Sequence, residues 1–438
     1  MKNLIKICKE LRSFLILWST QSFSALGSSM TSFALVVWSY QQQGSALTTA
    51  LLSVCTYAPY VLMSIFAGAL SDKWNKKVTM LVCDSLAAVS TAVVLILLAT
   101  GKLQVWHLYC LNAVNGLMNT VQKPAADVTV SLLTPKKHYQ KVSGLQSFSN
   151  SLVSILTPVI ATAFFSLFGI WAVMIFDLLT FSVAFAVLLC FVDIPQIQQE
   201  TKETESVLKS AKEGLQYLKQ NRGILDLILF LAAINFTASI YNAALPAMLL
   251  SRNGGGEIAL GVVNAITGLT MLVGSLLSSL LPPPQSRVRT ICNCLLISMS
   301  TENLFLALGQ SLPVWCIGAI LGWLCIPIMS ANMDVLFRSR IPISMQGRVY
   351  SARNTLQFFT IPLGYFFGGI LVDKVFEPFM ALQSTGSVLL RVFGHGKGSG
   401  AAMLFFVIAF IGIITCLVFR KDPYIWQLED DCRTDLNI

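Results

Sequence analysis

The chain has 438 residues, of which 55% are hydrophobic and only 12% are charged, and its mean hydropathy is +0.70. Soluble domains carry about 25% charged residues, so this composition excludes a water-soluble enzyme. The high apolar content also excludes a disordered chain. A polytopic membrane protein remains, and its net charge of +9 indicates either acidic partners or the orientation of the chain in a membrane.

Twelve apolar runs follow one another along the chain, most of them near the 20 residues that a helix needs to cross the ~30 Å hydrocarbon core. Strands of a membrane barrel would be about 10 residues long and alternate in polarity, so these runs predict helices. We therefore predict an all-α membrane protein with two halves of six transmembrane helices each. The predicted spans are 14–40, 46–70, 78–100, 105–121, 142–168, 170–192, 224–250, 259–281, 290–309, 312–334, 349–372 and 401–419.

The basic residues are unevenly distributed between the connections. With the N-terminus placed in the cytoplasm, 25 of the 30 Lys and Arg residues fall on the cytoplasmic side and none is left inside a span. By the positive-inside rule, both termini are predicted to lie in the cytoplasm and the protein in the cell (inner) membrane. The net charge is then an orientation signal, and no nucleic-acid partner is expected. Five basic residues fall in outer loops: Lys102, Arg252, Lys374, Arg391 and Lys397.

The connection 193–222 divides the predicted spans six and six. We expect an N-terminal half over 1–192, a cytoplasmic linker over 193–222, a C-terminal half over 223–420 and a cytoplasmic tail over 421–438. Halves of six helices joined by a cytoplasmic linker are used by secondary transporters, in which they rock about a site at the membrane midplane.

The second part of the linker has the pattern of an amphipathic helix. Apolar residues at helical spacing lie opposite charged ones, which predicts a helix on the inner membrane surface or on the cytoplasmic face of the bundle. The apolar positions are Val207, Ala211, Leu215 and Leu218, and the charged ones are Lys209, Lys212, Glu213 and Lys219.

Features of an enzyme or a metal protein are missing from the sequence. Most of the eleven cysteines fall in predicted spans, and none has zinc-ligand spacing with His107, His138 or His395. There is no phosphate-binding loop of the Walker type and no nucleophile–base pair. We expect no metal, no cofactor and no enzymatic activity.

Residues 68–77, after the second predicted span, read GALSDKWNKK. This segment resembles the signature loop of the major facilitator superfamily, whose pattern is G-x-L-A-D-R-x-G-R-K. Shorter segments in chain order resemble one branch of that superfamily, the macrolide-efflux-like drug exporters. They are SALGS at 24–28, GSA at 44–46, PA at 124–125, AKEG at 211–214, QGRVYS at 346–351, FEP at 376–378 and GSGA at 398–401.

The resemblance implies the major facilitator fold and a latch on the cytoplasmic side. Asp72 would meet the start of the eleventh span, where the free N–H groups of a helix favour a carboxylate by roughly 0.3–2 kcal/mol. Lys76 and Lys77 would either pair with Asp127 or only set the topology. The implied latch residues are Gly68, Asp72, Lys76, Lys77, Gly347 and Arg348.

Four acids are candidates for proton coupling. Asp84, Asp177 and Glu302 fall well inside spans, and Asp127 lies at the end of the fourth. Burial disfavours the charged form of a carboxyl group, so such a residue can exchange protons near neutral pH. The alternative follows from the resemblance, which places the third, sixth and ninth spans on the outside of the bundle. Asp84, Asp177 and Glu302 would then be hydrogen-bonded structural acids.

The first, fourth, seventh and tenth spans, which line the cavity in that superfamily, carry amides, aromatics and methionine. Apolar pockets with a few polar groups suit bulky amphiphiles, although Asn also forms hydrogen bonds between helices, worth about 0.6–2 kcal/mol each. The substrate-cavity candidates are Gln21, Met30, Phe33, Asn112, Asn115, Asn119, Asn235, Tyr241, Asn242 and Trp323.

These patterns together predict a monomeric secondary transporter that exports bulky neutral or cationic amphiphiles, such as macrolide-like drugs, by proton antiport with alternating access. Its partners would be the amphiphile, protons and the lipid bilayer. Anions are disfavoured because no cation lies in a span. The alternatives are an exporter of a siderophore or lysophospholipid, and a membrane receptor or scaffold that transports nothing.

Overall fold

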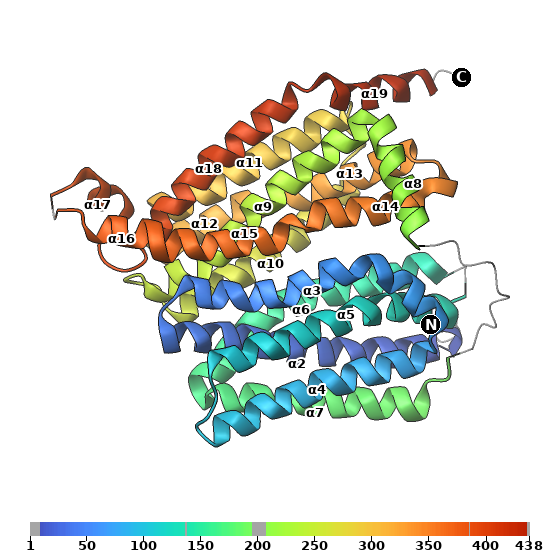
Figure 1. The fold of residues 1–438 in the computed structure, drawn as a ribbon, viewed down its shortest axis with the longest axis horizontal. Helices are drawn as coiled ribbons and strands as arrows, with labels where there is room; N and C mark the ends of the chain where they lie inside the picture. Colours follow the sequence, from blue (N-terminus) through green and yellow to red (C-terminus); the bar gives the residue numbers. More distant parts are fainter. Residues whose placement is uncertain (1–8, 136–137, 195–206, 385, 436–438) are drawn as a thin grey trace. The chain divides into compact units, whose positions relative to one another are not determined.

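In the computed structural model, residues 9–135, 138–194, 207–384 and 386–435 are described, and all their regular secondary structure is helical (Figure 1). They form two compact units. Unit 1 comprises Met1–Trp38 and Cys55–Thr204, and unit 2 comprises Ser39–Val54 and Glu205–Ile438. Residues 39–54 thus belong to unit 2, whereas the expected N-terminal half took in all of 1–192.

The all-α membrane fold expected from the sequence is confirmed, and ten of the helical segments described are long and apolar enough to cross a membrane. Ten of the twelve predicted spans fall in this set. The other two lie in α2 (Arg12–Gln43) and α5 (Val105–Leu133), helices of 32 and 29 residues with many Ser, Thr, Gln and Asn side chains. Their membrane crossing stays a prediction.

Unit 1 contains most of α2 and of α3 (Ala46–Lys73), together with α4 (Lys76–Ala99), α5, α6 (Tyr139–Phe168) and α7 (Ile170–Phe191). Helix α4 packs against α5 and α7. Most of the signature motif 68–77 lies in helices rather than in a loop, because α3 continues through Lys73 and α4 begins at Lys76. Asn75 ends this turn as the N-cap of α4, accepting hydrogen bonds from the amides of Lys77 and Val78 at 3.0 and 3.2 Å.

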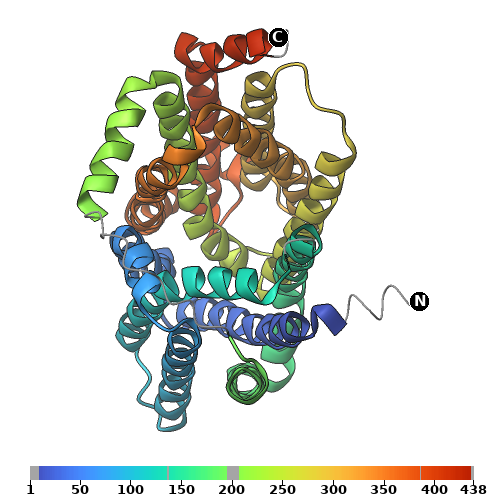
Figure 2. The ribbon, with the colours of Figure 1, turned by 90° about the vertical axis from the view of Figure 1, so that its right-hand side faces the viewer.

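Unit 2 is built around α9, a largely buried helix that packs against α15 and α18, while α11 packs along α18 (Figures 1 and 2). Its apolar core includes the fully buried side chains of Leu227, Phe230 and Leu295. The helices are α8 (Val207–Gln220), α9 (Arg222–Ser251), α10 (Glu257–Leu280), α11 (Arg287–Leu308), α12 (Leu312–Trp323), α13 (Ile326–Arg340), α14 (Ile343–Phe358), α15 (Thr360–Ile370), the π-helical turn η2 (Leu371–Phe376), α16 (Glu377–Ala381), α17 (Val388–Phe393), α18 (Ser399–Arg420) and α19 (Pro423–Asp435).

Two predicted spans of unit 2 are interrupted. The tenth is broken at Leu324 and Cys325 between α12 and α13. Pro327 causes this break because it has no N–H to donate to the carbonyl of Trp323, four residues earlier. The eleventh is divided into α14, α15, η2 and α16, and it extends well beyond its predicted end at 372. Its candidate membrane segment, Ala352–Ala381, includes Arg353 and Lys374, so the expectation that every span lacks basic residues is wrong for this one.

The predicted linker helix is α8, and it packs against α14 and α9, which favours the bundle face among the two expected locations. Its buried face is displaced from the predicted one, since Leu218 is fully buried but Leu215 is 42% exposed. Tyr217 donates a hydrogen bond to the Arg340 carbonyl at 3.2 Å and so ties α8 to the end of α13.

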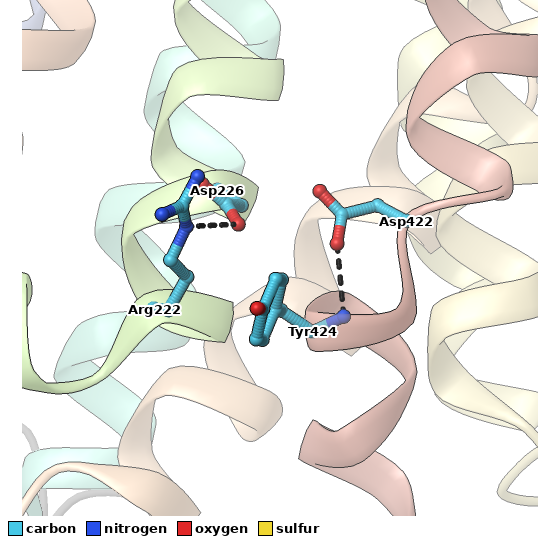
Figure 3. A network of polar contacts seen from close by, with 4 residues as sticks. All are labelled: Arg222, Asp226, Asp422 and Tyr424. Carbon is cyan, nitrogen blue, oxygen red and sulfur yellow. Dashed lines mark hydrogen bonds and ion pairs between the residues drawn. The ribbon is translucent and has the colours of Figure 1, made fainter.

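The expected tail forms α19, which packs against α9 and α11. Figure 3 shows where the start of α19 meets α9. Arg222 of α9 donates to Asp226 at 3.4 Å, and the Arg222 guanidinium lies 5.3 Å from the ring centroid of Tyr424 on α19. Asp422 accepts a hydrogen bond from the Tyr424 amide at 2.9 Å (Figure 3). Further along, the Glu429 carboxylate caps α11 by accepting from the Val288 amide at 2.9 Å. We refer to this side of unit 2, where α8 and α19 lie, as the linker end.

Candidate functional site

Glu302 is a buried acid in the middle of α11, and two neutral side chains from other helices bind it. The Tyr241 hydroxyl on α9 and the Trp323 indole N–H on α12 both donate to Oε1 of Glu302, each at 2.5 Å. The Glu302 side chain is only 3% exposed. Among the residues described, none forms an ion pair with it and none donates to Oε2. Oε1 therefore accepts two bonds, and Oε2 is the oxygen on which a proton can reside.

Backbone features hold this cluster together. A Cβ on Gly322 would lie 2.5 Å from the Cβ of Glu302, so only glycine allows α12 to approach α11 this closely. Trp323 is the last residue of α12, immediately before the break imposed by Pro327. A Cβ on Gly274 of α10 would lie 2.4 Å from the Leu324 carbonyl oxygen, so α10 also approaches the break closely. Trp323 thus lies where the helix direction can change.

The two acids of unit 1 are bound differently. Asp177 on α7 is 4% exposed, and it accepts from Ser28 at 2.9 Å on Oδ1 and from Thr91 at 3.1 Å on Oδ2. Asp84 on α4 is half-buried, and it accepts from Gln21 at 3.1 Å on Oδ2 and from the Gln122 amide on Oδ1. Each carboxylate joins three helices and has a donor on both oxygens, an arrangement that suits a structural acid.

Asp127 is exposed on α5. One expectation was that Lys76 and Lys77 pair with this acid, but Lys77 makes other contacts. The Lys77 ammonium donates to the carbonyls of Leu189 and Val192, at 3.0 and 2.7 Å. These carbonyls lie at the C-terminus of α7, where the helix dipole favours a cation. Lys76 donates to the Trp74 carbonyl at 3.2 Å.

The other four implied latch residues are described only in their backbone. Gly68 and Asp72 lie in the last turns of α3, and Gly347 and Arg348 lie in the first turns of α14. Their side-chain placement falls outside what the structure describes, so the latch stays a prediction.

Several of the substrate-cavity candidates make hydrogen bonds within their own unit. Gln21 binds Asp84, whereas Tyr241 and Trp323 bind Glu302. Asn112 donates to the Leu108 carbonyl at 2.9 Å and accepts from Thr56, and Asn235 donates to the Gln357 carbonyl at 3.4 Å. These contacts are of the kind that joins membrane helices, and substrate binding by these residues stays a prediction.

The other candidates differ in exposure. Met30 is fully buried and Phe33 half-buried, as is usual for packing side chains. Asn119 and Asn242 are exposed. Asn115 has a buried side-chain oxygen with no hydrogen-bond partner among the residues described, so this amide has unused capacity for a ligand.

Sequence reasoning missed Gln122, Ser28 and Thr91, the donors to the unit 1 acids. Gln122 had a signal, because it lies three residues after Asn119 and directly follows the fourth predicted span, so a helix continued by one residue would place both on one face. Nothing marked Thr91, and Ser28 stood out only as part of the 24–28 segment and not as a donor, since hydroxyl side chains are common in membrane helices and usually bond to their own backbone.

The comparisons with known proteins agree with this fold. The family model for the Major Facilitator Superfamily matches residues 17–365. Macrolide efflux protein A of Streptococcus pyogenes is 24% identical over 366 residues, which cover 83% of this chain and 90% of that protein.

Solved structures show the same architecture. A bacterial homologue of the human lysosomal transporter Spinster, in an inward-facing and occupied conformation, has a TM-score of 0.70 at 14% identity, covering 96% of this chain and 97% of that one. The nucleoside transporter NupG has a TM-score of 0.68 at 12% identity, covering 94% and 99%. This multi-pass membrane protein is a transport protein rather than an enzyme, and it belongs to the Major Facilitator Superfamily.

Proposed function

We propose that this transporter exports bulky neutral or cationic amphiphiles of the macrolide type from the cytoplasm by proton antiport, and that Glu302 carries the proton. The observation that supports this is the binding of a buried carboxyl group by Tyr241 and Trp323, the only partners it has in the part of the chain that the structure describes. An ionised side chain at the centre of a bilayer costs at least ~2.5–3.5 kcal/mol, and no basic residue among those described forms an ion pair with Glu302.

The position of the two donors connects proton binding to movement. Tyr241 belongs to the seventh predicted span and Trp323 to the tenth, which the superfamily resemblance assigns to the cavity lining. When Glu302 gains or loses its proton, the strength of both hydrogen bonds changes, because bonds to a charged acceptor are roughly twice as strong as neutral ones. Trp323 lies next to the break between α12 and α13, so this change acts on a helix end that can move.

The substrate class is supported by charge and by the relatives. Apart from Arg353 and Lys374, which lie toward the two ends of the segment 352–381, the interior of the described spans offers acids and amides, which disfavours phosphorylated or sulfated substrates. Arg353 is itself engaged with Gln357 at 3.1 Å and with the Phe337 ring at 4.3 Å. The relative in Streptococcus pyogenes is named for macrolide efflux, which makes macrolides the first compounds to test.

The test is uptake into inverted membrane vesicles with an imposed pH gradient, using macrolides, a siderophore and a lysophospholipid as the panel. We expect macrolide uptake that collapses when a protonophore removes the gradient. Uptake that does not depend on the gradient would reject proton antiport. Uptake of only the siderophore or the lysophospholipid would show that macrolides are not the substrate class. If no compound is taken up by correctly inserted protein, a receptor or scaffold is the better assignment.

A further inference from the structure

At the end of unit 2 opposite the linker end, residues 39–54 pack against helices that come much later in the chain. This segment contains the end of α2 and the start of α3. The Tyr40 hydroxyl donates to the Ala247 carbonyl at 3.1 Å, and Gln41 donates to Glu257. The Lys397 ammonium lies 5.7 Å from the Tyr40 ring centroid. Most of α2 and α3 nevertheless belong to unit 1, so both helices continue from one unit into the other.

One carboxylate, Asp373, makes the central polar contact with this segment. It lies in η2 and accepts three hydrogen bonds from the start of α3: from the Ser45 hydroxyl at 2.5 Å, the Ala46 amide at 2.9 Å and the Leu47 amide at 2.8 Å. The first amides of a helix have no partner within it, and they carry the positive end of its dipole. Asp373 therefore acts as an N-cap for α3, although 326 residues separate it from Leu47.

The backbone next to Asp373 is shaped for this contact. Gly369 lies one turn before it, and a Cβ there would be 2.6 Å from the Cα of Leu47. The neighbouring Gly368 faces another helix, because its Cβ would be 2.9 Å from the Cβ of Ala243 on α9. The helix that carries Asp373 thus has one glycine against α3 and one against α9, and only the first belongs to the contact with residues 39–54.

A second carboxylate, Glu377, provides an internal comparison. It lies four residues after Asp373 and caps α18, accepting from the Gly398 amide at 2.9 Å and the Ala401 amide at 3.1 Å. Nearby, burial lowers the pKa of the Arg252 guanidinium, and the Glu377 charge opposes that shift. Both acids cap membrane helices in the same way. Glu377 joins parts of 205–438 to each other, whereas Asp373 joins that part of the chain to residues 39–54.

We propose that Asp373 and the start of α3 form a releasable lock within unit 2, which holds residues 39–54 against the rest of that unit in this conformation and opens in the state that discharges substrate. The inference rests on the alternating access of the proposed function. Release leaves α3 intact, because water can bind the freed amides of its first turn. Ser45 and Asp373 are both half-exposed, so water has access to the contact.

The lock itself is tested by hydrogen exchange measured by mass spectrometry on the full-length protein in lipid nanodiscs. In Asp373→Asn, we expect the amides of residues 46 and 47 to exchange roughly tenfold faster, which corresponds to the loss of a cap worth about 1.4 kcal/mol. The matched control is Glu377→Gln, which should accelerate exchange at residues 398 and 401 and leave 46 and 47 protected. Unchanged exchange at 46 and 47 in Asp373→Asn, or an equal increase in Glu377→Gln, would overturn the lock.

A second variant guards against misfolding. Ser45→Ala removes one of the three donors from the other side of the contact, so we expect a smaller increase in exchange at residues 46 and 47. If Asp373→Asn does not insert into the membrane, this variant decides the question alone, and exchange equal to that of the wild type counts against the lock.

Release is tested on wild-type protein in proteoliposomes with erythromycin, with and without a pH gradient, while transport is measured on the same sample. During transport, exchange at residues 46 and 47 should rise and exchange at 398 and 401 should not. Transport with unchanged protection of 46 and 47 would overturn release of the lock. If no transport occurs, the proposed function fails, and the two capping variants still decide whether the lock exists.

Discussion

Glu302 in unit 2 and Asp177 in unit 1 are buried to almost the same extent, 3% and 4% exposed, but their partners differ. Each oxygen of Asp177 accepts from one hydroxyl, of Ser28 or Thr91, and these side chains come from two other helices. Glu302 has two aromatic donors on one oxygen. The difference indicates that equal burial does not imply an equal role: Asp177 joins helices, whereas Glu302 has one oxygen that no described residue bonds and that can hold a proton.

Helix geometry strengthens the contrast. Gly27 of α2 lies against α7, since a Cβ there would be 2.9 Å from the Cα of Asp177, and both helices are continuous at this point. Glu302 instead lies against Gly322, and the next residue ends α12. Discontinuous helices at membrane depth commonly mark sites of transport.

The largest expected effect comes from Glu302→Gln, which keeps the size of the side chain and removes the titrating group. We expect gradient-driven macrolide uptake into inverted vesicles to fall by roughly 5- to 150-fold, the range of coupling free energies of about 1–3 kcal/mol. Uptake that stays at the wild-type level, with equal amounts of protein in the membrane, would remove Glu302 from the mechanism and end the contrast with Asp177.

Gly322→Ala should rank next, because the added methyl group would lie 2.5 Å from the Cβ of Glu302. We expect it to cost about 1–3 kcal/mol in stability, the usual penalty of overpacking, and to lower the unfolding temperature in detergent. Gly386→Ala is the control, since a Cβ at Gly386 meets no atom within 4 Å. Equal unfolding temperatures for the two variants would show that α11 and α12 are not in close contact.

Tyr241→Phe should have a smaller effect, because Trp323 still donates to Oε1 of Glu302. The lost hydrogen bond to a group that can be charged is worth about 1.5–3 kcal/mol when the group is ionised and about 0.5–1.5 kcal/mol when it is neutral. The loss therefore disfavours the ionised state of Glu302. The pH dependence of uptake should move to higher pH, and a shift to lower pH or none would mean that Tyr241 does not stabilise the carboxylate.

The smallest effect on transport is expected from Asp177→Asn. An amide keeps one acceptor for Ser28 or Thr91, so gradient-driven uptake should change less than twofold, while stability falls by about 1 kcal/mol for the lost bond. Thermal unfolding and vesicle uptake measured on the same preparation separate the two quantities. A loss of uptake as large as that of Glu302→Gln would reverse the assignment of roles.

Much of the fold was predictable because the bilayer imposes simple rules on the sequence. Long apolar runs predicted the helices, and the Pro282–Pro283–Pro284 stretch explains why α10 ends at Leu280. The amphipathic linker helix was predicted as well, although its buried face was displaced, because tertiary contact with α14 decided which side packs.

The site was predictable only as a set of separate residues. Glu302, Tyr241 and Trp323 each stood out as polar or aromatic groups inside apolar spans, but Glu302 was weighed with three other acids and the two aromatics with eight other side chains. Asp373 did not stand out at all, because an acid just after a predicted span looks like an ordinary loop residue.

The sequence by itself determined the class of protein, the helical spans and the family, because each depends on composition and on order along the chain. Only the tertiary structure decided that Glu302 lies against two aromatic donors and a helix break, that Lys77 caps α7, and that Asp373 caps α3. The physical reason is that a buried or capping carboxylate acts according to the donors around it, and those come from helices that are 21 to 326 residues away in the chain.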